Sequence, residues 1–323
     1  MAVTLYEAAQ IAAANGRSGP AGVMLTFARE VPLLNAMPVE DILGGAYVWN
    51  REVSTGTNAF RGVNEAFSES TGQTETRSIA LKIIGGDLDV DVVLLKTAGM
   101  GLRAQKEEAK AADLGQRIAY SMIKGSTTAA GGATADAKGF DGLQVRYGGG
   151  FGSTAVVDAG ENASQIIANT GASDALSMRD LDIAIQATTK PTHLIMPKKQ
   201  ILNITGYLRN SSSIVQSKDE YGRQVTSYAG LPIIEADPLG TISGLEPIGY
   251  NENNDTTTSI YVVSLSDEGL HLAQNGGIET KDLGELQTKP VMRTRVSWFC
   301  NMVDPHPRCV TRLYNIADLV AVA

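Results

Sequence analysis

The sequence predicts an α+β protein, and three observations lead to that prediction. Strand-like runs at residues 44–53 and 78–96 flank a long polar segment, so they are expected to form one extended hairpin. Helix-forming residues fill 97–124, which indicates a single long helix. From Ser259 onward the chain consists mostly of strand-like segments. The long helix and the closing strands therefore occupy separate blocks of the chain, as in α+β proteins.

The composition is that of a folded protein. Of the 323 residues, 43% are hydrophobic and 19% are charged, which suffices for one or two cores. The net charge is −8 and no basic run is longer than Lys198-Lys199, which argues against tight nucleic-acid binding. The chain has no apolar run of about 18 residues, and Glu7 stands where a signal peptide needs a basic start, so we expect a cytoplasmic protein. Two cysteines are too few for a disulfide framework, and free thiols are expected.

Residues 1–46 are expected to form an N-terminal arm with short helices. Leu5, Ala8 and Ala12 recur at helical spacing, but glycines and prolines interrupt the region repeatedly. The arm leads into the first strand-like run.

The polar segment from Ser54 to Ser78 cannot build a core of its own. Twelve of its 25 residues are Ser, Thr or Gly, and its large apolar residues are Phe60, Val63 and Phe67. Fixing so many backbone residues costs far more conformational entropy than the burial of three side chains returns. The segment is therefore either disordered or held by something outside its own domain, and long connections of this kind are commonly functional.

The run at 78–96 is predicted to return as one long strand. Its Gly85-Gly86 pair suggests a β-bulge. The three aspartates that follow are spaced as in a calcium loop, but Val92 and Ala98 stand where that loop needs glycine and glutamate. Period-two alternation explains the pattern better, with the apolar residues facing a core and these side chains facing water: Asp87, Asp89 and Asp91.

The helix at 97–124 is predicted to pack through one face. Its apolar stripe ends at the helix-stopping Gly125 and comprises Ala111, Leu114, Ile118 and Met122. The next segment, FDGLQVRY at 140–147, is predicted to be a short strand between glycine-rich loops.

Two further segments complete the predicted architecture. Residues 173–237 have the pattern of an α/β subdomain, in which Ser177 and Asp180 form an S-x-x-D helix start before the strand THLIMP and a second helix. Near the end of the chain, 291–303 and 308–316 flank the turn Asp-Pro-His-Pro and are predicted to pair as a hairpin.

Three motifs are candidates for chemical sites, and none of them predicts a catalytic or cofactor site. The run at 148–155, GGGFGSTA, has dinucleotide-fingerprint spacing, but no helix follows it, so a flexible loop is preferred. His193 and His271 stand in strand-like runs without a partner at motif spacing. One group could in principle bind zinc, although its spacing matches no common pattern: Cys300, Asp304, His306 and Cys309.

The order of segments resembles the major capsid protein of tailed bacteriophages, which has the Hong Kong-type phage capsid fold. The resemblance spans nearly the whole chain and rests on layout and short stretches of sequence rather than on a catalytic signature. These stretches are PVEDILGGAYVWNREV running into FRGVNEAFSESTGQTE, the helix after DVDVVLLK, KGFDGLQVRY, HLIMPKKQILNI, TSYAGLPIIEAD and RTRVSWFCNMVDPHPRCVTRLYNI.

The resemblance implies a division of the chain into the parts of that fold. The expected parts are an N-terminal arm (1–46), an E-loop hairpin (47–95), a P-domain (96–159) whose spine helix is 97–124, an axial A-domain (160–243) and a region of P-domain β structure with the C-terminal strands (244–323).

The resemblance also implies a function and partners. Pentamers and hexamers of the chain would build an icosahedral head shell around double-stranded DNA, in the virion after assembly in the host cytoplasm. A separate scaffold, a portal and a decoration protein are the expected partners, with no membrane, metal or cofactor and no enzymatic activity. The arm before Tyr47 lacks a long charged pro-segment, so the scaffold is expected to be a separate protein, or the chain to be already processed.

The polar segment would then lie across a neighbouring subunit. Phe60, Val63 and Phe67 would be the anchors of that contact, within a polar rim of Arg61, Glu65, Glu69 and Arg77. Some relatives form an isopeptide cross-link through a lysine in this segment, but this chain has no lysine there, since its first lysine is Lys82, beyond the segment. The arginines of the segment cannot replace a lysine, because a guanidinium stays protonated and is not an amine nucleophile. We expect a shell held by non-covalent contacts.

Two alternatives remain open at the level of sequence. An encapsulin-like compartment would share the fold and enclose protein instead of DNA. A soluble enzyme of unknown class would behave as a small discrete oligomer in light scattering.

Overall fold

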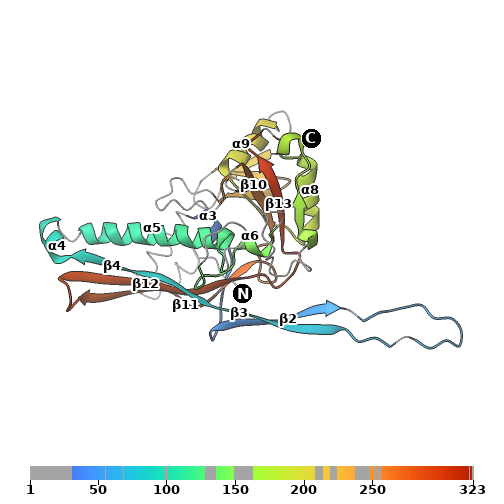
Figure 1. The fold of residues 1–323 in the computed structure, drawn as a ribbon, viewed down its shortest axis with the longest axis horizontal. Coiled ribbons are helices and arrows are strands. Elements are labelled where there is room, and N and C mark those ends of the chain that lie inside the picture. The colour runs from blue at the N-terminus through green and yellow to red at the C-terminus, as the bar shows by residue number, and fades with distance from the viewer. Residues whose placement is uncertain are drawn as a thin grey trace.

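The computed structural model describes residues 31–54, 56–67, 69–98, 101–127, 136–148, 163–207, 214–218, 224–236, 248–250, 252, 256–319 and 321. They form a body built on two sheets, from which a long hairpin projects (Figure 1). The short helices expected before residue 31 and the glycine run at 149–155 lie outside the described residues.

The first sheet has four strands in the order β1-β11-β12-β4 and carries the long helix α5 (Gly101–Lys124). Its strands are β1 (Val39–Asp41), β11 (His271–Glu285), β12 (Val291–Val303) and β4 (Lys82–Asp91). The predicted apolar stripe of α5 is confirmed, because all four of its residues are buried: Ala111, Leu114, Ile118 and Met122.

The second sheet has seven strands and is covered on both faces. Its strands are, in spatial order, β5 (Ile166–Ala168), β13 (Val310–Ala317), β10 (Thr257–Val263), β6 (His193–Met196), β9 (Leu231–Glu235), β8 (Gln224–Tyr228) and β7 (Ile214–Lys218). Alternate residues of β10 enter different cores: Ile260 and Val262 join the cluster with α8 (Met178–Ala187) and α9 (Lys198–Tyr207), whereas Tyr261 and Val263 face the cluster with α5. The β10 strand is therefore buried on both faces.

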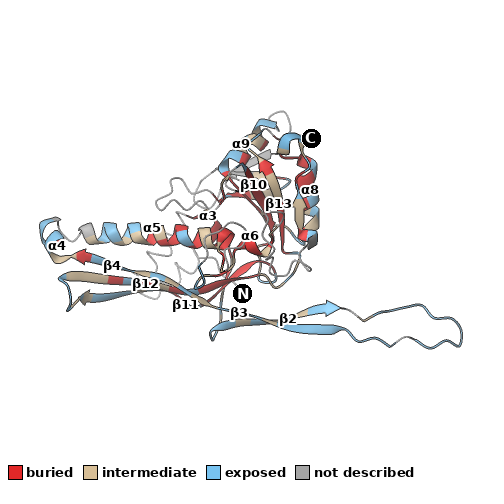
Figure 2. Ribbon diagram, viewed as in Figure 1, coloured by how far each residue is buried: buried red, intermediate tan, exposed pale blue. Residues whose placement is uncertain are grey.

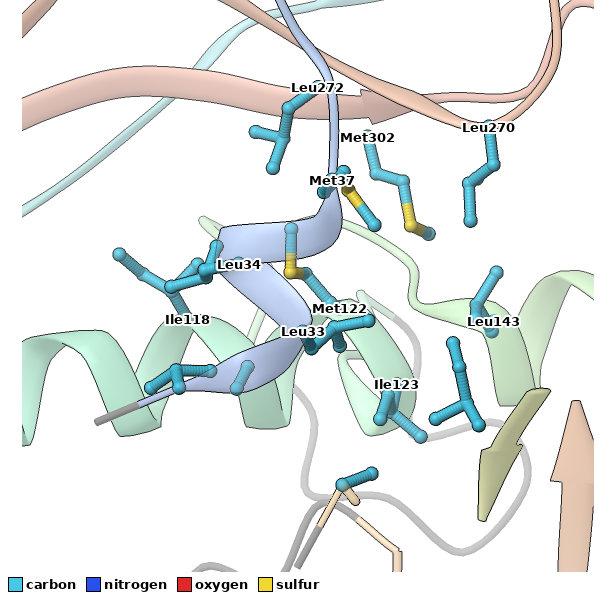
Figure 3. Close-up of a cluster of buried hydrophobic side chains, with 14 of the residues drawn as sticks. Leu33, Leu34, Met37, Ile118, Met122, Ile123, Leu143, Leu270, Leu272 and Met302 are labelled. Carbon is cyan, nitrogen blue, oxygen red and sulfur yellow. The ribbon is translucent and has the colours of Figure 1, made fainter. Parts of the chain in front are cut away.

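The cluster around α5 joins the two sheets into one body (Figure 3). Helix α3 (Pro32–Ala36) places Leu33 and Leu34 against α5, while Leu272 of β11 and Met302 of β12 close the cluster from the four-stranded sheet. The helix start predicted at Ser177 is confirmed, since its hydroxyl accepts a hydrogen bond from the Asp180 backbone N–H at 3.3 Å.

A buried arginine links the seven-stranded sheet to the short helix α6 (Leu143–Arg146). Arg312 of β13 is fully buried and pairs with Glu252 at 3.1 Å. It also donates hydrogen bonds to the Ser259 hydroxyl (3.0 Å) and to the Tyr147 carbonyl oxygen (2.9 Å). One side chain thus holds three segments that are far apart in the sequence.

The projecting hairpin consists of β2 (Ala46–Ser54) and β3 (Gln73–Ala80), which form a separate two-stranded sheet. It points away from the body on the side opposite the free ends of β4 and β12, and most of it is exposed (Figures 1 and 2). The prediction of an extended hairpin with a polar tip is confirmed in outline.

The expectation of one strand over 78–96 is wrong. The chain leaves the hairpin at residue 80, continues as β4 beside β12, and then forms helix α4 (Val92–Ala98). The helix begins where the Asp91 carboxylate accepts a hydrogen bond from the Val93 backbone N–H at 2.7 Å, which favours a helical turn over an extended one. The long helix accordingly begins at Gly101 and not at 97.

The expected bulge at Gly85-Gly86 is also absent from the described strands. The register of β4 and β12 is unbroken from Lys82 opposite Cys300 to Asp91 opposite Val291. A Cβ atom on Gly85 would collide with the Val296 carbonyl oxygen. Glycine here allows a close approach of two backbones in a regular ladder.

The segment at 140–147 is helical where a strand was expected. Leu143, Gln144 and Val145 are all buried in α6, so protein surrounds the segment on every side. When a short segment is buried on every side, its apolar residues show neither the helical nor the strand period, so the sequence does not distinguish the two.

The last two strands do not pair with each other, contrary to expectation. β12 is an inner strand of the four-stranded sheet, whereas β13 lies between β5 and β10 in the seven-stranded sheet. The range 244–323, expected to be one β region, is therefore divided between the two sheets.

Candidate contact surface on the projecting hairpin

The hairpin tip, residues 55–72, presents apolar side chains that contact no core. Phe60, Val63 and Phe67 are each at least 69% exposed. Aromatic and aliphatic side chains at a loop tip are costly to leave in water, and patches of this kind mark sites of interaction. These are the three side chains for which the sequence predicts an anchoring role, and that role stays a prediction.

Polar groups of the tip order it locally. The Arg61 guanidinium lies 4.9 Å from the centre of the Phe67 ring and donates a hydrogen bond to the Glu65 carbonyl oxygen at 3.0 Å. The Glu65 carboxylate accepts a hydrogen bond from the Gly62 backbone N–H at 2.8 Å, and Asn64 takes a left-handed backbone conformation in the turn. The tip therefore has a defined shape although, within the described part of the chain, it packs on no other element.

The structure separates one predicted residue from the others. Glu69 is exposed at the tip together with Arg61 and Glu65. Arg77 instead lies on β3 opposite Trp49, with its guanidinium 3.2 Å from Glu75, and it lines a cleft at the base of the hairpin. Six of the seven predicted contact residues are thus gathered at the tip, and the seventh is not.

The strands of the hairpin add no core of their own. Val48 and Val53 are exposed, and residues on both faces of β2 and β3 are exposed or half-buried. An isolated two-stranded hairpin is marginally stable in water.

The base of the hairpin meets the body at a cleft of about 610 Å³. The Asn301 side-chain amide donates a hydrogen bond to the Ala80 carbonyl oxygen at 2.8 Å, and the Tyr47 ring lies 5.3 Å, edge to face, from the imidazole of His271. Few contacts cross this junction, so it is the natural place for the hairpin to change its angle relative to the body.

The imidazole of His271 is buried at this junction. Its Nδ1 lies 3.1 Å from the Gly269 carbonyl oxygen, which can only accept, so Nδ1 donates this hydrogen bond. Its Nε2 lies 3.4 Å from a Glu40 carboxylate oxygen. Burial lowers the pKa of His271, and this outweighs the hydrogen bond to Gly269 and the charges of Glu40, Asp267 and Asp304, which raise it. Burial and Glu40 together raise the pKa of Tyr47.

We expect acidification to loosen this junction. The folded state holds a pKa for His271 below the unfolded value of 6.5, so its contribution to stability is complete above that pH and declines as the pH falls below it. The measurement is the slope of the unfolding temperature between pH 7 and pH 5. The His271→Asn variant, whose amide can keep the donor to Gly269, should show a shallower slope than wild type, whereas His306→Gln at an exposed histidine should change the slope less. Equal slopes for wild type and His271→Asn would contradict the assignment.

The sheet face opposite α5 carries side chains that the sequence analysis did not single out. Ile83 of β4 and Phe299 of β12 stand directly opposite each other and are 68% and 40% exposed. Further along the same two strands, Arg295 binds Asp87 and Arg293 binds Asp89, each at 2.6 Å. The hydrogen bonds from these arginines lower the pKa of both aspartates. Asp87 and Asp89 are exposed to water as predicted and each binds an arginine, whereas Asp91 is half-buried at the start of α4.

The four residues considered as zinc ligands, Cys300, Asp304, His306 and Cys309, do not converge on one point in the structure. Cys300 and Cys309 are buried free thiols, and Asp304 pairs with Arg146 at 2.6 Å while His306 is exposed. Within the described part of the chain, no three His, Cys, Asp or Glu side chains gather closely enough to hold a metal ion. None of the described helices has the length and apolarity needed to cross a bilayer.

Comparison with solved structures identifies the fold. No protein-family model matches the sequence, and no curated protein sequence matches it significantly. The SrpI encapsulin of Synechococcus elongatus is 13% identical, with a TM-score of 0.63 over 90% of this chain and 89% of that chain. A structure from Mycobacterium phage Bobi is 12% identical, with a TM-score of 0.57 over 91% of each chain. The capsid of a native GTA particle is 14% identical, with a TM-score of 0.55 over 86% of this chain and 88% of that chain.

These likenesses show the fold that the resemblance implied. The chain has the α+β architecture of the Hong Kong-type phage capsid fold, which encapsulins share.

Proposed function

We propose that the chain is a structural shell protein that assembles with copies of itself into a closed, hollow particle. The observation that carries the proposal is the projecting hairpin, which holds an ordered tip with exposed apolar side chains far from its own body. A second copy would supply the surface that the tip lacks. The fold, shared with phage and encapsulin shells, supports the same conclusion.

The contents of the particle are proposed to be double-stranded DNA, as in a phage head. The net charge of −8 suits a wall that encloses a polyanion without binding it tightly. We propose pentamers and hexamers as the building units, a virion as the location after assembly in the host cytoplasm, and a scaffold, a portal and a decoration protein as partners. An encapsulin-like compartment is the second candidate, favoured by the TM-score of 0.63 to the SrpI encapsulin.

The fold also supports a division of labour along the chain. The E-loop would be the hairpin β2–β3, the P-domain the four-stranded sheet with α5 as its spine, and the A-domain the seven-stranded sheet with α8 and α9. In this assignment β10 and β13 belong to the A-domain, because they are central strands of its sheet.

We expect the purified chain, alone or with a scaffold, to form rings or shells in negative-stain microscopy. Boiled and reduced particles should run as a single band near 34 kDa, because no lysine lies in the tip to form a covalent cross-link. Nuclease-protected DNA recovered from particles made in cells would support a phage head, and a protein cargo would support a compartment. A strict monomer at tens of micromolar, with or without a scaffold, would contradict the proposed function.

A further inference from the structure

Two asparagine side chains tether the root of the projecting hairpin to the four-stranded sheet. The Asn275 amide donates a hydrogen bond of 2.8 Å to the Gly44 carbonyl oxygen, just before β2 begins. The Asn301 amide donates a hydrogen bond of 2.8 Å to the Ala80 carbonyl oxygen, at the end of β3. Each tether therefore fastens one limb of the hairpin through a side-chain nitrogen of the sheet.

The two tethers differ in the residue that follows each asparagine. Asn301 is buried, and the next residue is the bulky Met302, whose backbone N–H donates a hydrogen bond of 2.8 Å to the Asn301 side-chain oxygen. Asn275 is exposed, and the next residue is Gly276, which is exposed too. An asparagine before a glycine is open to attack by its own backbone, because no Cβ atom shields the glycine nitrogen. The Asn275 tether is therefore the labile one of the two.

The backbone around Asn275 leaves room for this reaction. The β11–β12 register shifts between Gln274 and Ile278, and the register of β1 with β11 ends at Gln274. Among the described strands, residues 275–277 thus have no Cα partner in either neighbour of β11. Gly276 has a φ of +78°, and a Cβ atom placed on it would meet nothing within 4 Å. The bulge therefore keeps the attacking backbone nitrogen out of the regular ladder and uncrowded by side chains.

The reaction at such a pair is an intramolecular substitution at a thermolabile asparagine. The Gly276 backbone nitrogen attacks the side-chain carbonyl carbon of Asn275 and forms a cyclic imide. The bond from that carbon to Nδ2 breaks, and the nitrogen leaves as ammonia with the proton of the Gly276 amide. Water then opens the ring at either carbonyl, which leaves aspartate or isoaspartate at position 275.

The nitrogen that leaves is the donor of the tether. Deamidation thus removes the hydrogen bond to Gly44 and leaves two acceptors, a carboxylate and the Gly44 carbonyl oxygen, facing each other. The product also adds a negative charge next to Asp41, which is the register partner of Gln274. The hydrogen bond of 2.8 Å from the Ile42 N–H to the Gln274 carbonyl oxygen remains as an attachment of this limb.

We propose that Asn275 is a site of spontaneous deamidation that loosens one limb of the projecting hairpin from the four-stranded sheet, while the Asn301 tether holds the other limb. Asn275 and Gly44 are both exposed, so water reaches their hydrogen bond and it opens without unfolding of a core. The modified form accumulates with the age of the chain. The inference concerns the folded chain itself and goes beyond the proposed function.

The experiment follows the full wild-type chain by peptide mapping and mass spectrometry during storage at neutral and at mildly alkaline pH. The expected result is conversion of Asn275, with Asn301 intact in the same digest. Conversion should be faster at the higher pH, because loss of its proton makes the Gly276 amide nitrogen nucleophilic. Gly276→Ala should slow the conversion about tenfold or more, because its Cβ atom crowds the attacking nitrogen. An Asn275 that stays intact in the folded chain while the urea-denatured chain converts would overturn the proposal.

Two variants test the loosening of the limb. Asn275→Asp carries a product of the reaction from the start, and deuterium exchange of peptides from residues 42–54 should be about two- to tenfold faster in it than in wild type, because one tethering hydrogen bond is lost. Asn58→Asp is the matched control, since it adds the same charge at the exposed tip and touches neither tether. Both variants should keep the unfolding temperature of the unassembled chain. Unchanged exchange in Asn275→Asp, or an equal effect of Asn58→Asp, would overturn the loosening.

Discussion

A chain in which residues 55–72 are replaced by Asn-Gly is expected to fold normally and to form no closed shell. Ser54 and Gln73 are paired across the hairpin, so a two-residue type I′ turn can join the strands without strain. The removed residues form no part of either core. The unfolding temperature should therefore stay within about 2 °C of that of the unassembled wild-type chain. Light scattering and microscopy should show loss of assembly.

A triple variant provides the matched control for this deletion. Phe60→Ser, Val63→Ser and Phe67→Ser together keep the length of the tip and remove its three exposed apolar side chains. If these side chains are the anchors, the triple variant should fail to assemble as completely as the deletion does. Normal shells from the triple variant would show that backbone contacts of the tip suffice. A collapse of thermal stability in the deletion would show that the hairpin supports its own subunit.

The substitution Arg312→Met is expected to have the largest effect on subunit stability. Arg312 and Glu252 form a buried pair, and the Ser259 hydroxyl bonds both partners: it accepts from Arg312 and donates to the Glu252 carboxylate at 2.6 Å. Removal of the arginine leaves the Glu252 carboxylate buried without its counter-charge and frees the Tyr147 carbonyl oxygen from its partner. The loss should be about 3 to 5 kcal/mol in the free energy of unfolding, measured by urea denaturation.

A double variant separates the charge effect from the packing effect. Adding Glu252→Gln to Arg312→Met removes the uncompensated carboxylate, so the double variant should recover part of the stability that the single variant loses. If Arg312 instead stabilises the subunit mainly by packing, independent of its charge, the double variant should be less stable than either single variant.

The sequence predicted the elements whose signals are local. The stripe of α5, the Ser177 cap and the hairpin with its apolar tip residues can each be read within a window of a few turns or strands, because burial of one face imposes a period on the residues. The tip was predicted from a missing core and not from a period. A segment that is too polar to build a core but contains two phenylalanines is expected to bury them against a surface outside its own domain.

Strand partners were not predictable in the same way. The turn between β12 and β13 has the length and the prolines of a hairpin turn. Nevertheless β12 pairs with β11 and with β4, which lies about 200 residues earlier in the chain, and β13 pairs with β10 and β5. Partner choice depends on which non-local surfaces are complementary, and a single sequence carries no direct signal of that. The Ile83–Phe299 pair was missed for this reason, because its two halves meet only through the β4–β12 register.

The strand order of the four-stranded sheet has a consequence for synthesis of the chain. β1 and β4, near the start, find their partners only in β11 and β12, near the end: Val39 pairs with Leu272, and Lys82 pairs with Cys300. During translation the early strands and α5 must therefore wait for most of the polypeptide to leave the ribosome before their sheet can close. The Ile83–Phe299 pair accordingly cannot form on a chain that terminates before β12. Such a chain keeps β4 as an unpaired strand, so the four-stranded sheet cannot close.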